Sequence, residues 1–255
     1  MKILICGKGG SGKSTISVMV ARALNAKGYR VLLLDADESN LGLARLLGAE
    51  EAVGLTDSLG GKKGAKNKMM EAFSHGMPAF VNEKWRFADI PHDFFVECDG
   101  IRLLTIGKIH QFGEGCACAM GSISKTLLGN LETGKQEMVI VDTEAGIEHL
   151  GRGVDAGADM ILSIVDPSFD SFLLARKIAE MGNNMGKPVY FVLNRTDAEI
   201  ESLMADQVDA ERIIARIPEN RTLFRDAMQG KSLIAALPGV EDICSFLYKF
   251  KSAGQ

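Results

Sequence analysis

Short apolar runs alternate with helix-length segments along the chain. Runs dominated by Ile, Val and Leu occur at 2–6, 29–34, 101–106, 138–141, 159–165, 189–193 and 212–217. Strands that are buried on both faces have this composition, because both sides of the sheet meet apolar neighbours. Helical periodicity separates the runs, most clearly at 14–27, 169–185 and 240–250. The repeated strand-then-helix order predicts an α/β fold with a doubly wound, mostly parallel sheet and helices on both faces.

The segment 51–100 departs from this pattern. Apolar periodicity fades there, and lysines cluster among glycines and polar residues (Lys62, Lys63, Lys66 and Lys68). We interpret the segment as an irregular insertion in a single domain spanning 1–255, because no internal repeat or low-complexity linker marks a second domain. The lysine cluster is typical of a solvated face, and docking to an acidic partner is the alternative.

The composition is that of an ordinary globular protein. The 255 residues are 46% hydrophobic and 24% charged, which is enough to bury a large core. The net charge of −4 provides no basic field for a nucleic acid or an anionic membrane. No apolar run approaches the roughly 20 residues that cross a bilayer, and the chain enters a predicted strand without a basic leader. We therefore expect a cytoplasmic protein with neither a nucleic-acid nor a membrane partner.

A glycine-rich loop follows the first predicted strand. Residues 7–14 have the sequence GKGGSGKS, which fits the phosphate-binding pattern G-x-x-x-x-G-K-[ST]. In such a loop, backbone N–H groups and a helix N-terminus bind phosphate oxygens. Lys13 would neutralise the β- and γ-phosphates, and the Ser14 hydroxyl would hold Mg²⁺. The candidate residues for binding ATP or ADP are Gly9, Gly10, Ser11, Gly12, Lys13, Ser14 and Thr15.

Acidic residues follow two predicted strands, at the edge where open α/β sheets bind ligands. Asp37 follows the second run, and a carboxylate there suits phosphoryl transfer, which depends on positioning and charge. Asp142 directly follows the run 138–141 in the manner of a Walker B acid and would hold Mg²⁺ with Ser14. Gly146, in the loop after Asp142, would let the chain sense the γ-phosphate. Capping of a helix or strand end is the alternative for both acids.

Two of the five cysteines, Cys116 and Cys118, form a C-x-C pair. Two thiolates are too few for the four-coordinate sites that soft metals prefer, whereas a two-fold dimer would supply four. The spacing alone is a weak signal, because two ordinary thiols can also have it. The cysteines do not form the dense, even framework of a secreted disulfide protein, and Cys6 and Cys244 lie in apolar patterns typical of a core.

Together these motifs resemble the deviant Walker A family of P-loop proteins that includes MinD, ParA and the nitrogenase iron protein. Its loop, GKGGxGK[ST], has an extra lysine, here Lys8. The resemblance implies that Lys8 reaches the partner's nucleotide in a dimer and that Asp37 polarises the attacking water. The implied catalytic residues are Lys8, Lys13, Asp37 and Asp142. The implied nucleoside-binding residues are Asn194, Arg195, which replaces the usual lysine, and Pro218, with Gly146 near the phosphates.

Within this family, the C-x-C pair and the string DTEAGIEHLGRG at 142–153 resemble the nickel-insertion ATPases of the CooC type. That resemblance implies a homodimer that binds Ni²⁺, with Zn²⁺ as a substitute in vitro, through Cys116 and Cys118 of both subunits. The client would be carbon monoxide dehydrogenase or a related nickel enzyme. Ser11 replaces the commoner valine, and Glu38 stands where relatives usually have proline. Thiolates bind Zn²⁺, Ni²⁺ and Cu⁺ alike, so the pair does not select the metal.

Two other functions stay open. An electron-transfer ATPase like the nitrogenase iron protein needs two cluster cysteines per subunit, and the sequence has none between Asp142 and Cys244. A positioning ATPase of the MinD or ParA kind needs an amphipathic tail or a basic surface. The apolar stripe within 240–251 is more typical of a packed terminal helix. His149 is an auxiliary metal ligand or a structural residue.

Overall fold

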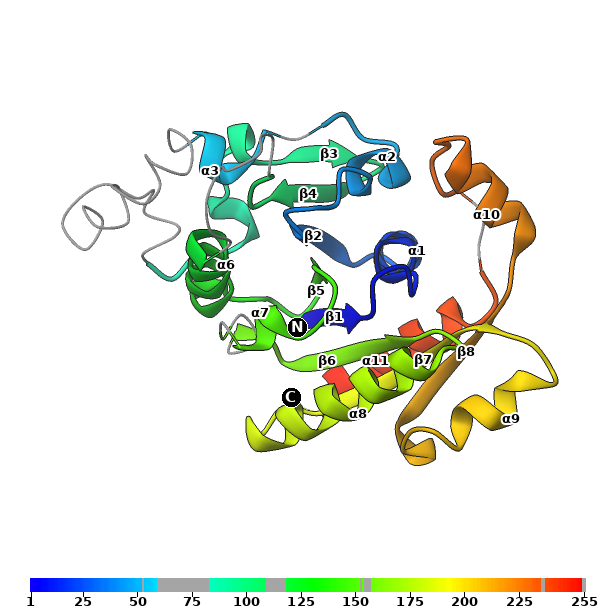
Figure 1. Cartoon of the computed structure of the whole chain (residues 1–255). Helices are drawn as coiled ribbons and strands as arrows, with labels where there is room; N and C mark the ends of the chain where they lie inside the picture. The colour runs from blue at the N-terminus through cyan, green and yellow to red at the C-terminus, as the bar shows by residue number, and fades with distance from the viewer. Residues whose placement is uncertain are drawn as a thin grey trace.

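The computed structural model describes residues 1–51, 53–58, 83–108, 118–151, 153, 157–234 and 237–253, with backbone only at 57–58, 118–120 and 148. Its strands are β1 (Lys2–Gly7), β2 (Arg30–Ala36), β3 (Val96–Cys98), β4 (Ile101–Thr105), β5 (Glu137–Thr143), β6 (Met160–Val165), β7 (Val189–Thr196) and β8 (Ile213–Pro218). They form one sheet in the order β3-β4-β2-β5-β1-β6-β7-β8 (Figure 1). Every neighbouring pair is parallel except β3 and β4. The predicted doubly wound α/β fold is confirmed.

Helices cover both faces of this sheet (Figure 1). They are α1 (Lys13–Ala26), α2 (Leu43–Leu47), α3 (Leu55–Ser58), α6 (Cys118–Asn130), α7 (Glu148–Gly151), α8 (Phe169–Asn184), α9 (Ile200–Ala205), α10 (Arg221–Met228) and α11 (Val240–Ala253). Short 3₁₀ turns lie at Phe87–Asp89, His92–Phe94 and Ala210–Arg212. In the described part of the chain, the helices lack the length and apolar character that a membrane span requires.

Alternate side chains of the central strands enter two separate cores, because successive residues of a strand point to opposite faces. Ile3 and Ile5 of β1 belong to the core that includes α1 and α11 residues. Leu4, between them, belongs to the core that includes α6 and α8 residues. Burial on both faces explains why the strands lack an alternation of polar and apolar residues. Packing on both faces also fixes the carboxyl ends of the strands, from which the loops of the candidate site emerge.

The segment 51–100 contributes more structure than its weak periodicity predicts. Trp85 and Phe87 are buried in the α6 side of the core, and the Trp85 indole Nε1 donates to the Leu127 carbonyl at 3.0 Å. The edge strand β3 also lies here. The apolar pattern does not indicate β3, because this strand is three residues long and only partly buried. The lysine cluster at 62–68 lies outside the described residues.

Candidate functional site

The loop between β1 and α1 depends on glycine geometry. Gly7, Gly10 and Gly12 have φ angles of +147°, +79° and +101°, which residues with a side chain rarely adopt. A Cβ at Gly12 would overlap the side-chain amide of Asn194. Gly12 also precedes the first turn of α1, which no side chain caps within the described residues. The N–H groups of that turn are therefore available to an anion such as a phosphate.

Lys13 folds back over this loop. Its Nζ donates to the carbonyl oxygens of Gly7 at 3.2 Å and Lys8 at 3.3 Å, and the residue is buried. A buried ammonium held by two carbonyl groups places positive charge at the mouth of the loop, and no carboxylate of the described residues forms an ion pair with it. An anionic phosphate would balance this positive charge, in agreement with the predicted role of Lys13 in neutralising the β- and γ-phosphates.

Ser14 and Asp142 meet where α1 starts and β5 ends. The Ser14 hydroxyl donates to Asp142 Oδ2 at 2.6 Å, and the Ser17 hydroxyl donates to Asp142 Oδ1 at 3.0 Å. Burial raises the pKa of Asp142, although these hydrogen bonds and the charge of Lys13 oppose the rise. The Asn40 amide donates to the Ser14 hydroxyl at 2.8 Å. A hydroxyl and a carboxylate this close are the hard oxygen ligands that Mg²⁺ prefers, so the site fits the ion.

Asp37 stands at the start of the loop after β2 and is buried. Its Oδ1 accepts hydrogen bonds from the backbone N–H groups of Ser39 at 2.9 Å and Asn40 at 3.1 Å, and from the Ser39 hydroxyl at 2.7 Å. The carboxylate therefore caps a turn. Asp37 also lines the hollow described next, so the capping role and a role at the phosphates are compatible.

A hollow of about 660 Å³ extends from the glycine loop to the ends of β7 and β8. The candidates that line it are Gly9, Gly10, Gly12, Lys13, Ser14, Thr15, Asp37, Asn194, Arg195 and Pro218. Asn194 is tied to the loop, because its Nδ2 donates to the Ser11 carbonyl at 2.7 Å. Arg195 has a φ of +60° at an irregularity between β7 and β8. Such strain in a residue with a side chain is typical of functional sites.

Part of this lining is not predicted from the sequence. Asn220, Leu223 and Phe224, at the start of α10, also line the hollow. The helix begins where the Asn220 side chain accepts from the Leu223 N–H at 2.9 Å. Asn40 was also missed, although it directly follows the acidic DADES stretch after the second strand. An Asn cap after an apolar strand is a local signal that could have identified Asn220.

Lys8 belongs to the glycine loop, and Gly146 is hydrogen-bonded to the start of that loop. Gly146, with a φ of +93°, donates its N–H to the Gly7 carbonyl at 3.3 Å, which joins the loop after β5 to the glycine loop. Lys8 Nζ lies 3.4 Å from Asp166 Oδ2, and a third of the lysine side chain is exposed. The predicted residues of the nucleotide site therefore gather at one edge of the sheet, where α1 begins and where β1, β2, β5, β7 and β8 end.

The side chains of both predicted metal ligands lie outside the described part of the chain. Cys116 lies outside the described residues, and Cys118 begins α6 with only its backbone described. Within the described ranges, no group of three or more His, Cys, Asp or Glu side chains is arranged to hold a metal ion. His149 packs with its Nε2 3.0 Å from the Cys6 sulfur, and both side chains are buried.

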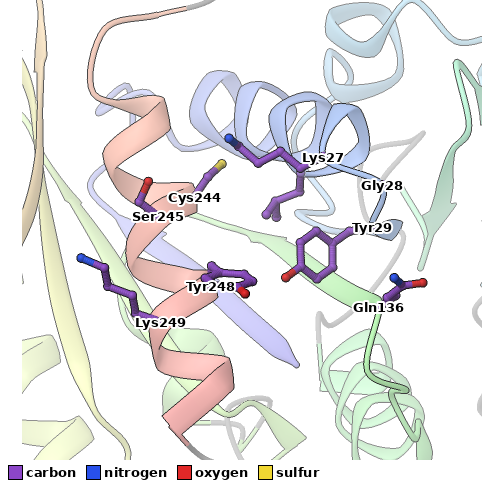
Figure 2. A pocket seen from close by; sticks show the side chains of 9 residues that line it. Lys27, Gly28, Tyr29, Gln136, Cys244, Ser245, Tyr248 and Lys249 are labelled. Carbon is purple, nitrogen blue, oxygen red and sulfur yellow. The ribbon is translucent and has the colours of Figure 1, made fainter.

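A second hollow, of about 490 Å³, lies at the other end of α1. Figure 2 shows the side chains of Lys27, Tyr29 and Tyr248 around it, with Cys244 on α11. Among its described lining residues there is no carboxylate, and its glycine, Gly28, belongs to a turn at the end of α1. It therefore lacks the loop and the acids that the first hollow combines.

Comparison with known proteins agrees with this geometry. The model of the CobQ/CobB/MinD/ParA nucleotide binding domain matches residues 2–234. An uncharacterized ATP-binding protein of Methanocaldococcus jannaschii is 43% identical over 98% of this chain and 100% of that protein. The carbon monoxide dehydrogenase accessory protein CooC of Rhodospirillum rubrum is 32% identical over 95% of this chain and 92% of its own length. The fold matches MinD of Pyrococcus horikoshii, solved with Mg-ADP, with a TM-score of 0.63 and 18% identity, covering 100% and 95% of the chains.

Proposed function

The chain belongs to the CobQ/CobB/MinD/ParA family of nucleotide-binding proteins and is an ATPase, and from this premise we propose that it is a nickel metallochaperone. As a homodimer it binds Ni²⁺ through Cys116 and Cys118 of both chains, and it uses ATP hydrolysis to support insertion into carbon monoxide dehydrogenase or a related nickel enzyme. The observation that carries the proposal is the C-x-C pair in a chain that is 32% identical to CooC along nearly its whole length.

The nucleotide occupies the 660 Å³ hollow in this proposal. The glycine loop and the uncapped first turn of α1 bind the phosphates, and Lys13 neutralises them. Ser14 and Asp142 hold Mg²⁺, which supplies positive charge to the phosphate oxygens when bound. Asn194, Arg195 and Pro218 lie at the nucleoside end. Asp37 faces the γ-phosphate and positions the attacking water.

Lys8 links nucleotide binding to the second subunit. Lys8 belongs to the phosphate loop, and its ammonium forms an ion pair with Asp166. Phe169, three residues beyond Asp166, is 68% exposed, and Leu173, one turn further along α8 on the same helix face, is also exposed. Exposed apolar side chains near a charged residue are typical of a protein–protein interface. We therefore place the second copy of the chain against Lys8, Phe169 and Leu173.

The nickel ion is the cargo and needs both subunits. Two C-x-C pairs brought together on a two-fold axis offer four thiolates, which suits a soft or borderline metal. Closure of the dimer by ATP would bring the pairs together. By linkage, ATP then raises the affinity for Ni²⁺ by the same factor as Ni²⁺ raises the affinity for ATP.

Anaerobic titration of the reduced protein with Ni²⁺ tests this proposal, with and without a non-hydrolysable ATP analogue, while the molecular mass is followed in the same samples. We expect a single ion shared by two chains, tighter binding with the analogue, and loss of the ion in Cys118→Ala. Cys98→Ala is the matched control, because Cys98 is a half-buried free thiol on β3. Lys13→Ala should bind Ni²⁺ without any effect of the analogue.

Three results would contradict the proposal. Undiminished nickel binding in Cys118→Ala would place the ion on other ligands. Analogue-driven dimers that bind no metal would favour a positioning ATPase. Iron–sulfur absorbance after anaerobic purification, lost in Cys118→Ala, would favour an electron-transfer role.

A further inference from the structure

Lys108 lies three residues beyond the end of β4 and is the last described residue before Cys116. Its ammonium forms an ion pair with Asp35, with Nζ 2.7 Å from Oδ2. It also donates to the backbone carbonyl oxygens of Asp37, at 2.6 Å, and Asn40. An ammonium has three N–H donors, and each of these contacts uses one of them. Only 13% of the side chain is exposed.

The turn that Lys108 contacts carries two groups of the nucleotide site. Asp37 begins the turn and lines the hollow. Asn40 ends the turn and donates to the Ser14 hydroxyl and, at 3.4 Å, to Asp142 Oδ2. Lys108 therefore joins the carbonyl groups at the two ends of the turn through one ammonium.

Asp35 anchors the ammonium on the sheet. It is the next-to-last residue of β2, is 3% exposed, and lies opposite Thr105 of β4 in the register. The Ile106 N–H donates to the Asp35 carbonyl at 3.0 Å, which joins the chain leading to Lys108 to the same strand. One side of Lys108 is therefore held by rigid strands and the other by a loop, which is how a supporting residue fixes the geometry of a site.

We propose that Lys108 is a positioning residue for ATP hydrolysis: it holds the turn from Asp37 to Asn40 so that Asp37 faces the γ-phosphate. The inference rests on the proposed role of Asp37. A displacement of about 1 Å in such a group can lower a rate by roughly a hundredfold. The glycine loop and Lys13, which bind the phosphates in the proposed function, make no direct contact with Lys108 in the described part of the chain. Its loss should therefore lower kcat and leave ATP affinity nearly unchanged.

Lys108→Met tests this, because methionine keeps the apolar stem and removes all three donors. Lys2→Met is the matched control: Lys2 Nζ also donates to two backbone carbonyl groups, those of Leu128 at 2.8 Å and Leu131 at 3.0 Å, at the opposite edge of the sheet. We expect Lys108→Met to lower kcat by about ten- to hundredfold with a change in ATP Kd below about threefold. Lys108→Arg should recover part of kcat, and Lys2→Met should retain it.

A second variant distinguishes a folding defect from a loss of positioning. Lys108→Met leaves the buried Asp35 carboxylate without its cation, which can destabilise the protein. Asp35→Asn/Lys108→Met removes that charge as well and carries the same expectation for kcat. Thermal unfolding of each variant shows whether the measured protein is folded.

The outcomes separate this inference from the proposed function. Wild-type kcat in folded Lys108→Met overturns the positioning role, as does a loss that appears only in ATP Kd or that Lys2→Met reproduces. Unchanged kcat in Asp37→Asn overturns the role of Asp37 itself. Slow turnover in Asp37→Asn beside normal turnover in Lys108→Met overturns the inference about Lys108 alone.

Discussion

Lys8, the extra lysine of the glycine loop, forms an ion pair with Asp166 at the end of β6, with Nζ 3.4 Å from Oδ2. Burial alone would raise the pKa of Asp166, but hydrogen bonds with Ser171 and Ser168 and the charge of Lys8 outweigh burial and lower it. The ionised carboxylate thus holds Lys8 within its own subunit. For Lys8 to reach the nucleotide of a partner, this ion pair must break.

Asp166→Asn should therefore favour the ATP-dependent dimer. A partly exposed ion pair contributes about 0.2–1 kcal/mol. One such pair breaks in each of the two subunits, so we expect the dimer dissociation constant to fall by roughly two- to thirtyfold. Sedimentation with an ATP analogue measures this, and Asp170→Asn, on the first turn of α8, is the control. A weaker dimer in Asp166→Asn would mean that Asp166 itself contacts the partner.

Gly12→Ala should lower ATP affinity more than Gly10→Ala. Both glycines have positive φ, which costs an alanine about 1–2 kcal/mol. At Gly12 the new methyl group also overlaps the Asn194 amide, whereas a Cβ at Gly10 meets no atom within 4 Å among the described residues. We expect roughly a tenfold loss at Gly10 and at least another tenfold loss at Gly12. Calorimetric titration with ATP measures both, and equal losses would remove Asn194 as the cause.

Asp37→Asn should separate the charge of Asp37 from its capping role. Asparagine caps a turn about as well as aspartate, so the hydrogen bonds from Ser39 and Asn40 should survive. We expect ATP binding within about threefold of wild type and kcat lower by about a hundredfold or more, because water positioning needs the carboxylate. Asp37→Ala would lose the cap as well, and its greater loss of thermal stability would measure that part.

The sequence predicts those parts of the molecule whose cause is local. The run 138–141 is apolar at every position, which is the pattern of a central strand buried on both faces. The glycines at 7, 10 and 12 allow the positive φ angles that the loop requires. The ion pair between Lys108 and Asp35 joins residues far apart in the chain, so no spacing rule indicates it. The same holds for Trp85, whose burial depends on contact with α6 rather than on a period in its own segment.

Cys244 should be an unreactive thiol, in contrast to Cys98. Cys244 belongs to α11 beside the second hollow (Figure 2), and burial raises its pKa to about 12. The thiolate is the reactive form, so at pH 8.5 alkylation should be roughly a thousandfold slower in the folded protein than in urea, where the pKa is about 8.5. Peptide mapping by mass spectrometry follows both cysteines. Rapid labelling of Cys244 under native conditions would contradict its packing.

The same pKa shift predicts how stability changes in alkali. Between about pH 8.5 and pH 12 the unfolded chain has released the Cys244 proton while the folded chain retains it. The folded state therefore binds more protons, and the free energy of unfolding should fall as the pH rises through this window, by at most about 1.4 kcal/mol per pH unit. Cys244→Ala removes this contribution. Urea unfolding of both proteins at pH 8 and pH 10 should show a smaller loss for Cys244→Ala, and equal losses would mean that the thiol ionises as readily in the folded chain.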